Sequence, residues 1–205
     1  SYHSLREFPF DSHEFKILIG TLAERQDNVN FVADPDNTWI ANRLNIEGWD
    51  ISGVSIKAEP GEIEATGQIL SIATLSIHAA RSPEFYVYRV MLLLIFVVGM
   101  SWVIFWVPPS RFEFQIGIGA TSMLTAIAFN LALGGQLPPV GYLTTLDKMV
   151  IWAILLVFLS IIEALITGRL VLHGKEELAL SIDRACRVLF PVLLAGGWTG
   201  MILLV

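Results

Sequence analysis

Four long apolar segments that follow Arg81 constrain the fold more than any other feature of the sequence. They cover about residues 85–107, 112–134, 146–172 and 178–205. Val90–Val107 holds no charged residue and approaches the ~20 residues that a helix needs to cross a bilayer core. Because lipid offers backbone groups no hydrogen-bond partner, such segments must be helical. The sequence therefore predicts a four-helix transmembrane domain over residues 82–205.

Residues 1–81 have a different pattern. Hydrophobic residues make up 54% of the chain and charged residues only 16%, but this surplus lies after Arg81, and the first part mixes polar and apolar side chains. Polar and apolar residues alternate with a period near two, which predicts strands, over residues 15–19, 29–32, 49–57 and 68–78. The expected fold class is an α+β membrane protein, with a partial antiparallel β-sandwich followed by the helical bundle.

Charge indicates the topology and excludes some partners. The formal net charge is −6, and most acidic residues precede the helices, which argues against a nucleic-acid partner. Basic residues gather in the predicted link between the third and fourth helices and its flanks, at Arg169, Lys175, Arg184 and Arg187. Positively charged loops mark the cytoplasmic side, so the sheet and both termini are predicted to lie outside. Cys186 is the single cysteine, so a disulfide within the chain is impossible.

The second apolar segment carries a mixed stripe. As a helix, Arg111–Gln136 would be ~39 Å long, and helical spacing puts six residues on one face: Glu113, Gly117, Thr121, Leu124, Ala128 and Leu131. A lipid-facing stripe would not begin with a carboxylate, whereas a helix–helix contact tolerates small residues. Several copies around an axis would form an ion pore with a charged ring and an apolar neck. The pattern alone leaves a pore and a packed helix as equal alternatives.

Ordered motifs extend along nearly the whole chain. They are "FPFD" (Phe8–Asp11), "RSPEFY" (Arg81–Tyr86), "SWVIFW" (Ser101–Trp106), "TSMLTAIAFN" (Thr121–Asn130) and "LPPVGYLTTLDK" (Leu137–Lys148). In this order they resemble the pentameric ligand-gated ion channels (the Cys-loop receptor superfamily), particularly prokaryotic members. Ser1 and Phe15 stand where animal members have cysteines, and Leu93 stands where the family's first transmembrane helix commonly has proline.

The resemblance implies a ring of five identical subunits in the bacterial inner membrane, with a periplasmic N-terminal domain. Membrane lipid, permeant cations and an unknown small extracellular ligand are the other expected partners, and no cofactor is expected. Family chains carry further strands ahead of "FPFD", so we expect this chain to lack the first part of the extracellular domain.

The resemblance also implies roles for individual residues. Glu113 would favour cations, Leu124 would form the central gate, and Gly117 and Thr121 would line the narrow inner part of the pore. Asp11 and Arg81 match an ion pair at the junction that transmits gating. The expected gating junction comprises Phe8, Pro9, Phe10, Asp11, Arg81, Pro138, Pro139 and Tyr142.

The ligand pocket and calcium binding are less defined. Family pockets hold amines in an aromatic box, but Leu22 occupies one expected position and the capping loop with Glu62 and Glu64 has no aromatic residue. An acetylcholine-like ligand is therefore not expected. Asp34, Asp36 and Glu64 could bind Ca²⁺ as a modulator through carboxylate oxygens, with plain surface acidity as the alternative.

Glu163 lies inside the third apolar segment, where a carboxylate is unfavourable, and we expect it to pair with Arg187. A rival interpretation is a claudin-like membrane scaffold. Claudins, however, place the sheet after the first helix and hold it with two cysteines. An enzyme is not expected, because the sequence has no HExxH or GxSxG motif and its histidines are scattered.

Overall fold

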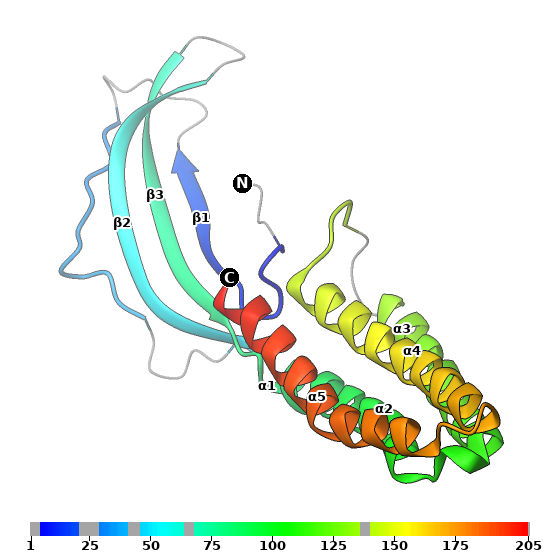
Figure 1. The fold of residues 1–205 in the computed structure, drawn as a ribbon. Coiled ribbons are helices and arrows are strands. Elements are labelled where there is room, and N and C mark those ends of the chain that lie inside the picture. Colours follow the sequence, from blue (N-terminus) through cyan, green and yellow to red (C-terminus); the bar gives the residue numbers. More distant parts are fainter. Residues whose placement is uncertain (1–4, 21–28, 41–45, 64–67, 136–139, 205) are drawn as a thin grey trace. The chain divides into compact units, whose positions relative to one another are not determined.

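The structure is a computed structural model that describes residues 5–20, 29–40, 46–63, 68–135 and 140–204 (Figure 1). The chain forms two compact units. One contains Pro9–Pro83 and is called the sheet unit; the other contains Glu84–Val205 together with Arg6–Phe8 and is called the helical unit.

The sheet unit is built on three antiparallel strands, β1 (Ser12–Gly20), β2 (Trp49–Ile63) and β3 (Gln68–Arg81). Their order is β1-β3-β2, so β3 is the central strand (Figure 1). Ser12 at the start of β1 pairs with Ala80, and Trp49 at the start of β2 pairs with Arg81. The register therefore brings the first residues of both outer strands to the end of β3.

Two expectations for the sheet were wrong. Val29–Val32 is not a strand; instead, the Phe31 amide donates to Ser71 Oγ at 2.8 Å. Residues 58–63, expected in a capping loop, belong to β2, in which Pro60 pairs with Ser71 of β3. A proline is compatible with this strand because β2 is an edge strand, where a missing N–H breaks no ladder.

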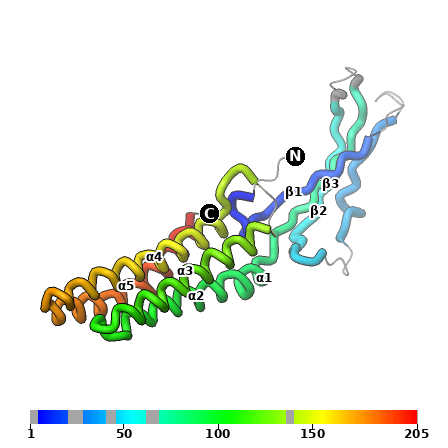
Figure 2. Tube along the Cα trace, turned by 90° about the vertical axis from the view of Figure 1, so that its right-hand side faces the viewer, coloured from blue at the N-terminus to red at the C-terminus, as the bar shows by residue number. Residues whose placement is uncertain are grey.

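Four helical spans make up most of the helical unit. The first span comprises α1 (Glu84–Tyr86), the π-helix η1 (Val87–Met91), α2 (Leu92–Trp102) and the 3₁₀ turn η2 (Val103–Trp106). The second is α3 (Phe112–Gly134), which follows the 3₁₀ turn η3 (Pro109–Arg111). The third and fourth are α4 (Thr145–Leu172) and α5 (Glu176–Leu203). All four are long and apolar enough to cross a membrane, and their ends lie within two residues of the predicted ones. Figure 2 shows them side by side, with α4 packed against α2, α3 and α5.

The first span is distorted although it lacks the family's proline. Leu93 occupies the expected proline position, and the five-residue π-helix η1 ends two residues before it. π-Helical turns interrupt the regular hydrogen-bond ladder and often accompany functional sites. In this chain a π-helical turn, and not a proline, makes the first span depart from regular α-helical geometry.

Side-chain hydrogen bonds attach α5 to the other helices. Pro191 lies inside α5 and has no N–H, so the carbonyl of Arg187, four residues earlier, loses its helical donor. Trp102 Nε1 of α2 donates to that carbonyl at 2.9 Å. Two more indoles connect α4 and α5, from Trp152 to the Leu193 carbonyl at 3.0 Å and from Trp198 to the Met149 carbonyl at 3.2 Å.

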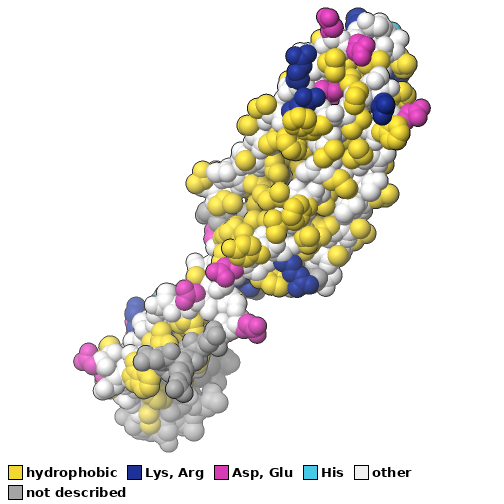
Figure 3. All heavy atoms as spheres, turned by 90° about the horizontal axis from the view of Figure 1, so that it is seen from below, with side chains coloured by type: hydrophobic (Ala, Val, Ile, Leu, Met, Phe, Trp, Pro, Cys, Tyr) yellow, Lys and Arg dark blue, Asp and Glu magenta, His cyan; other side chains and the backbone are white. Residues whose placement is uncertain are grey.

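The surface of the helical unit suits a bilayer. On the face in Figure 3, hydrophobic side chains cover most of it and charged side chains gather toward its ends. Exposed large apolar residues include Phe96, Phe158 and Val192 on three different helices. In water such a surface would promote association, whereas lipid solvates it.

Candidate functional site

One face of α3 is packed into the helical unit. Its buried residues are Gln115, Gly119, Ser122 and Ala126. Gln115 Nε2 donates to the carbonyls of Ile104 and Val107 at 3.2 and 2.9 Å. A Cβ at Gly119 would lie 2.6 Å from Ile161 Cγ1 of α4. This close approach and the amide hydrogen bonds fix the rotation of α3 about its axis.

The opposite face of α3 lies on the surface of the helical unit. It carries the six predicted pore residues, all exposed: Glu113, Gly117, Thr121, Leu124, Ala128 and Leu131. Leu124 and Leu131 are 70% and 72% exposed, and a Cβ at Gly117 would meet no atom within 4 Å. An open hollow of about 450 Å³ beside this face is lined by Glu113, Gly117 and Thr121 together with Met100 of α2 and Val103 of η2.

The hydroxyls on α3 bond to the helix itself. Thr121 Oγ1 donates to the Gly117 carbonyl at 2.9 Å, and Thr125 Oγ1 donates to the Thr121 carbonyl at 2.8 Å. Each hydroxyl proton therefore has a partner without leaving the helix. Both threonines are exposed, so their oxygen lone pairs can accept from water or contact a cation.

The predicted ion pair is present at the end of β3 in the sheet unit. Arg81 Nε donates to Asp11 Oδ1 at 2.8 Å, and Nη2 donates to Oδ2 at 3.1 Å. The Arg81 amide also donates to the Asp11 carbonyl at 3.0 Å. Pairing of the neighbouring residues Ser12 and Ala80 brings the two side chains together, and the two-pronged geometry is the strong form of this contact.

Two further residues complete this cluster, and the sequence did not identify them. His13 Nε2 lies 2.7 Å from Asp11 Oδ2, and the Arg81 guanidinium lies 4.3 Å from the centre of the Trp49 ring. Burial alone would raise the pKa of Asp11, but the hydrogen bonds and charge of Arg81 outweigh it and hold that pKa below its ordinary value of 3.8. The alternating pattern that predicted β2 could not predict the contact between Trp49 and Arg81. That contact depends on the register in which β2 pairs with β3.

The segment Arg6–Phe8 caps α4. The first amides of a helix have no intrahelical acceptor; here the Thr145 amide donates to the Arg6 carbonyl at 2.9 Å and the Leu146 amide to the Phe8 carbonyl at 3.1 Å. Thr144 and Asp147 form a reciprocal capping box for the same turn. The start of α4 is therefore held by backbone atoms from a distant part of the chain, which sequence reasoning missed.

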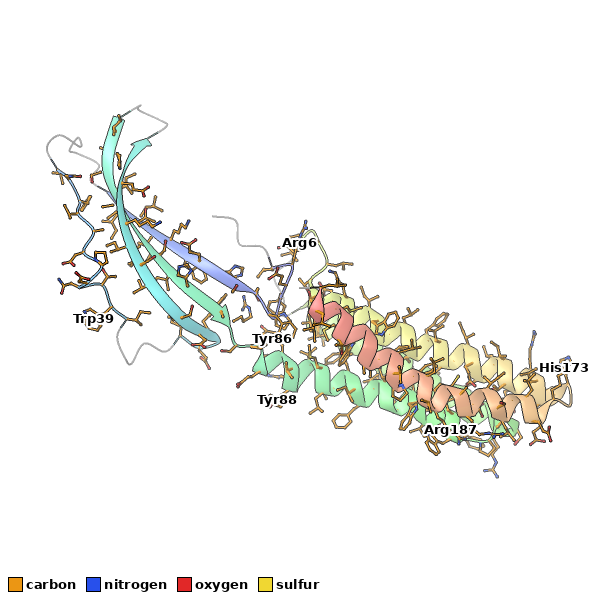
Figure 4. The ribbon with its side chains drawn as sticks, turned by 60° about the vertical axis from the view of Figure 1, so that its left-hand side comes forward. Arg6, Trp39, Tyr86, Tyr88, His173 and Arg187 are labelled. Atoms are coloured by element: carbon orange, nitrogen blue, oxygen red, sulfur yellow. The ribbon has the colours of Figure 1, made fainter. Side chains whose placement is uncertain are left out.

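Side chains reinforce this attachment. The Phe8 ring packs edge-on against Tyr86 at a centroid distance of 4.6 Å, and the Arg6 guanidinium lies 5.5 Å from the centre of the Tyr142 ring. Figure 4 shows Arg6 and Tyr86 at one end of the helical unit and His173 at the other. In the sheet unit, Pro9 is buried and Phe10 is half-buried. Pro138 and Pro139 lie outside the described residues.

The residues expected for ligand and calcium binding are only partly described. Leu22, Glu64 and the side chain of Glu62 lie outside the described part. Asp34 caps a turn, since its Oδ2 accepts from Asn37 Nδ2 at 2.6 Å and its Oδ1 from the Asn37 amide at 3.2 Å, and these bonds lower its pKa. Asp36 is exposed. The described residues contain no group of three or more His, Cys, Asp or Glu placed to hold a metal, and calcium binding stays a prediction.

The predicted Glu163–Arg187 ion pair was wrong. Arg187 Nε donates to the Phe105 carbonyl at 2.9 Å, and its guanidinium lies 4.5 Å from the centre of the Trp106 ring. Glu163 instead faces Asp183 of α5. Glu163 and Arg187 lie toward the ends of α4 and α5 that the short link joins, but the rotation of α5, which spacing in the sequence does not fix, decides which of its side chains Glu163 meets.

Comparisons with known proteins give several relatives, although no family model matches the chain. A proton-gated ion channel of Gloeobacter violaceus is 24% identical over 187 residues, 91% of this chain and 52% of the relative. The human glycine receptor subunit beta is 24% identical over 160 residues, 76% and 32% of the two chains. The pH-sensitive chloride channel 2 of Anopheles gambiae is 23% identical over 168 residues, 78% and 27% of the two chains. The chain thus spans about half, or less, of the length of these relatives.

These relatives are channels and receptor subunits rather than enzymes, as expected. Their similarity covers most of the chain, including the sheet and the helices. A small antiparallel sheet followed by four apolar helices is also the architecture that the motifs implied. The chain is part of a multi-pass membrane protein, and its sequence and architecture are similar to those of the pentameric ligand-gated ion channels of the Cys-loop receptor superfamily.

Proposed function

We propose that the whole protein is a ligand-gated ion channel in which α3 from five identical subunits lines the pore. The observation that carries this proposal is the exposed face of α3, which begins with Glu113, continues through Gly117 and Thr121 and becomes apolar from Leu124 onward. The opposite face of the same helix is packed against its own subunit. A helix held in this way presents a fixed polar surface to whatever surrounds it, and a water-filled axis suits that surface better than lipid does.

The proposed selectivity is for cations. Five copies of the exposed Glu113 at one mouth would attract cations and repel anions. Leu124, with Ala128 and Leu131 beyond it, would form an apolar neck that closes the path by excluding water. The basic residues around the link between α4 and α5 favour a cytoplasmic location for the Glu113 mouth and a periplasmic sheet unit in a bacterial inner membrane.

Gating would act through the continuous chain from Asp11 back to Arg6. A movement of the sheet unit would pull on Asp11, which Arg81 holds through two hydrogen bonds. The same stretch of chain ends in Arg6 and Phe8, whose carbonyls bond to the first turn of α4. Because α4 packs against α3, a shift of this turn would change the position of the pore-lining helix.

The stimulus is proposed to be a small extracellular ligand. The Gloeobacter relative is named for proton gating, so protons are the first stimulus to apply. Calcium is proposed as a modulator through Asp34, Asp36 and Glu64. Calorimetric titration of the full-length protein with calcium tests this role; Glu64→Ala should weaken binding, and equal heats from both proteins would contradict it.

Reversal potentials of the full-length channel in asymmetric salt test the selectivity. Glu113→Gln should reduce the preference for cations, and Glu113→Lys should reverse it. Glu177→Gln is the matched control, because Glu177 is an exposed acid at the start of α5, away from α3. Unchanged reversal potentials in both Glu113 variants would refute the proposed selectivity.

A second candidate is an anion channel, which the name of the mosquito chloride channel favours. In that case the wild-type reversal potential would follow the chloride gradient. A membrane scaffold without a pore would instead give no ion flux from liposomes under any stimulus, and this outcome would overturn the channel proposal itself.

A further inference from the structure

Two acidic side chains face each other inside the helical unit. Glu163 of α4 and Asp183 of α5 are only 8% and 1% exposed. Their carboxyl groups lie within hydrogen-bonding reach of each other, yet none of the four carboxyl oxygens meets a donor among the described residues. Two buried carboxylates at this separation cannot both be ionised without a large free-energy cost.

The surroundings offer little to neutralise them. The neighbouring core of the helical unit is apolar and consists of Ile104, Phe105, Leu156, Ala164, Cys186 and Phe190. The Thr167 hydroxyl donates to the Glu163 and Ala164 carbonyls of its own helix rather than to a carboxylate. Neither α4 nor α5 therefore supplies the missing donor.

Arg187 is the charged group that acts on the pair from α5, one turn after Asp183. Its Nε is committed to the Phe105 carbonyl. The buried polar side chains of α3 are both neutral: the Gln115 amide bonds to the end of the first span, and the Ser122 hydroxyl donates to the Ile118 carbonyl of its own helix. Arg111 on η3 and Arg184 on α5 are exposed, and the Cys186 thiol is uncharged at neutral pH.

We propose that Glu163 and Asp183 form a proton-binding site that holds one proton between α4 and α5. The proton would be covalently bound to one carboxyl oxygen and donated to the other carboxylate, which supplies the missing donor and produces a short charged hydrogen bond. The positive charges of one proton and of the Arg187 guanidinium together neutralise the two negative charges of the carboxylates. A divalent metal fits less well, because Ca²⁺ takes six to eight oxygens and the described residues contain no group of three or more His, Cys, Asp or Glu placed to hold a metal.

The site has a thermodynamic consequence. When α4 and α5 separate and unfold into water, both carboxyl groups ionise and release the proton at neutral pH. The packed state therefore binds one more proton than the separated state, and packing of α5 should weaken as the pH rises. This inference rests on the helical unit alone and holds whether or not the protein conducts ions.

Infrared spectroscopy of the purified full-length protein in lipid nanodiscs tests the site directly. We expect a carbonyl band of a protonated carboxyl group at neutral pH, lost in Glu163→Gln and in the double variant Glu163→Gln/Asp183→Asn. Glu177→Gln, at an exposed acid of α5, should retain it. A wild-type spectrum without the band, or an unchanged band in the double variant, overturns the proposal.

Thermal unfolding against pH gives a second readout. The wild-type unfolding temperature should fall as the pH rises through neutrality. Glu163→Gln should remove most of this dependence, since its amide donates permanently to Asp183. An equal pH dependence in the wild type and in Glu163→Gln would contradict the proposal. If Glu163→Gln does not fold, the wild-type infrared spectrum alone decides.

Discussion

The exposed faces of α3 and α4 differ, although both helices are apolar enough to span a membrane. Between Lys148 and Arg169, the exposed residues of α4 are all apolar: Ile151, Leu155, Phe158, Leu159, Leu165 and Ile166. The exposed face of α3 includes Glu113, Thr121, Thr125 and Asn130. Mean hydropathy therefore identifies both as membrane spans but cannot separate a lipid-facing helix from one that faces water.

The buried faces show the reverse arrangement. α4 turns Ser160, Glu163 and Thr167 into the helical unit, whereas α3 packs mainly through Gly119, Ser122 and Ala126 around the single amide of Gln115. Polar groups on α4 thus serve contacts within the subunit. On α3 they lie on the surface, which is what a helix shared with other subunits around an axis requires.

The largest expected effect separates the two faces of α3. Gly119→Leu should destabilise the protein by about 1–3 kcal/mol or more, because even a Cβ there would lie 2.6 Å from Ile161 Cγ1. Gly117→Ala should preserve or slightly raise stability, since its Cβ meets open space and alanine favours helices. Thermal unfolding of the assembled protein measures both. Equal destabilisation by the two changes would show that Gly117 is also packed.

The next effect separates α3 from α4. Leu124→Thr should hydrate the proposed neck and lower the stimulus needed for opening by roughly tenfold, or about 1.4 kcal/mol. Leu155→Thr is the matched change on the exposed apolar face of α4 and should leave the stimulus–response curve in place. Patch-clamp recordings decide this, and a shift of the same size in both variants would remove the functional distinction between the faces.

A smaller effect concerns how α4 begins. Thr144→Ala removes the side chain that accepts from the Asp147 amide and should cost about 1 kcal/mol. If α4 transmits gating, the response curve should shift while the reversal potential, set at α3, stays constant. Thr199→Ala, at an exposed threonine of α5, serves as the control. A changed reversal potential would mean that α4 contributes to the permeation path.

The smallest effect at neutral pH lies in the sheet unit. The lowered pKa of Asp11 means that its ion pair stabilises the folded state above the ordinary carboxyl pKa. This stabilisation is lost as the pH falls through the lowered value, so no change is expected between neutral and mildly acidic pH. Tryptophan fluorescence of Trp49 against pH measures the transition. Asp11→Asn should abolish this acid-dependent step, and its persistence in that variant would assign it to another group.

Helix positions could be predicted because membrane spans need long apolar runs, and the ends of α3 and α4 agree with the structure within one residue. The common face of Glu113 and Leu124 followed from helical spacing alone. The Asp11–Arg81 pair followed from the motifs that precede β1 and end β3.

Contacts between elements could not be predicted in the same way. Trp102 bonds to the Arg187 carbonyl because Pro191 frees it and α5 turns it toward α2. The rotation of α5 about its axis also decides that Glu163 meets Asp183. Pro60 lies in an edge strand and not in a turn. A proline is tolerated there because of the strand order, which the local sequence around Pro60 does not reveal.

The capping of α4 has a consequence for biosynthesis. Thr145 Oγ1 and its amide both bond to the Arg6 carbonyl, 139 residues earlier in the sequence. A ribosome therefore delivers the acceptor long before the donors, and the newly inserted α4 has an incomplete first turn until the earlier segment returns to it. Completion of this turn therefore depends on tertiary packing and cannot occur while α4 is considered by itself.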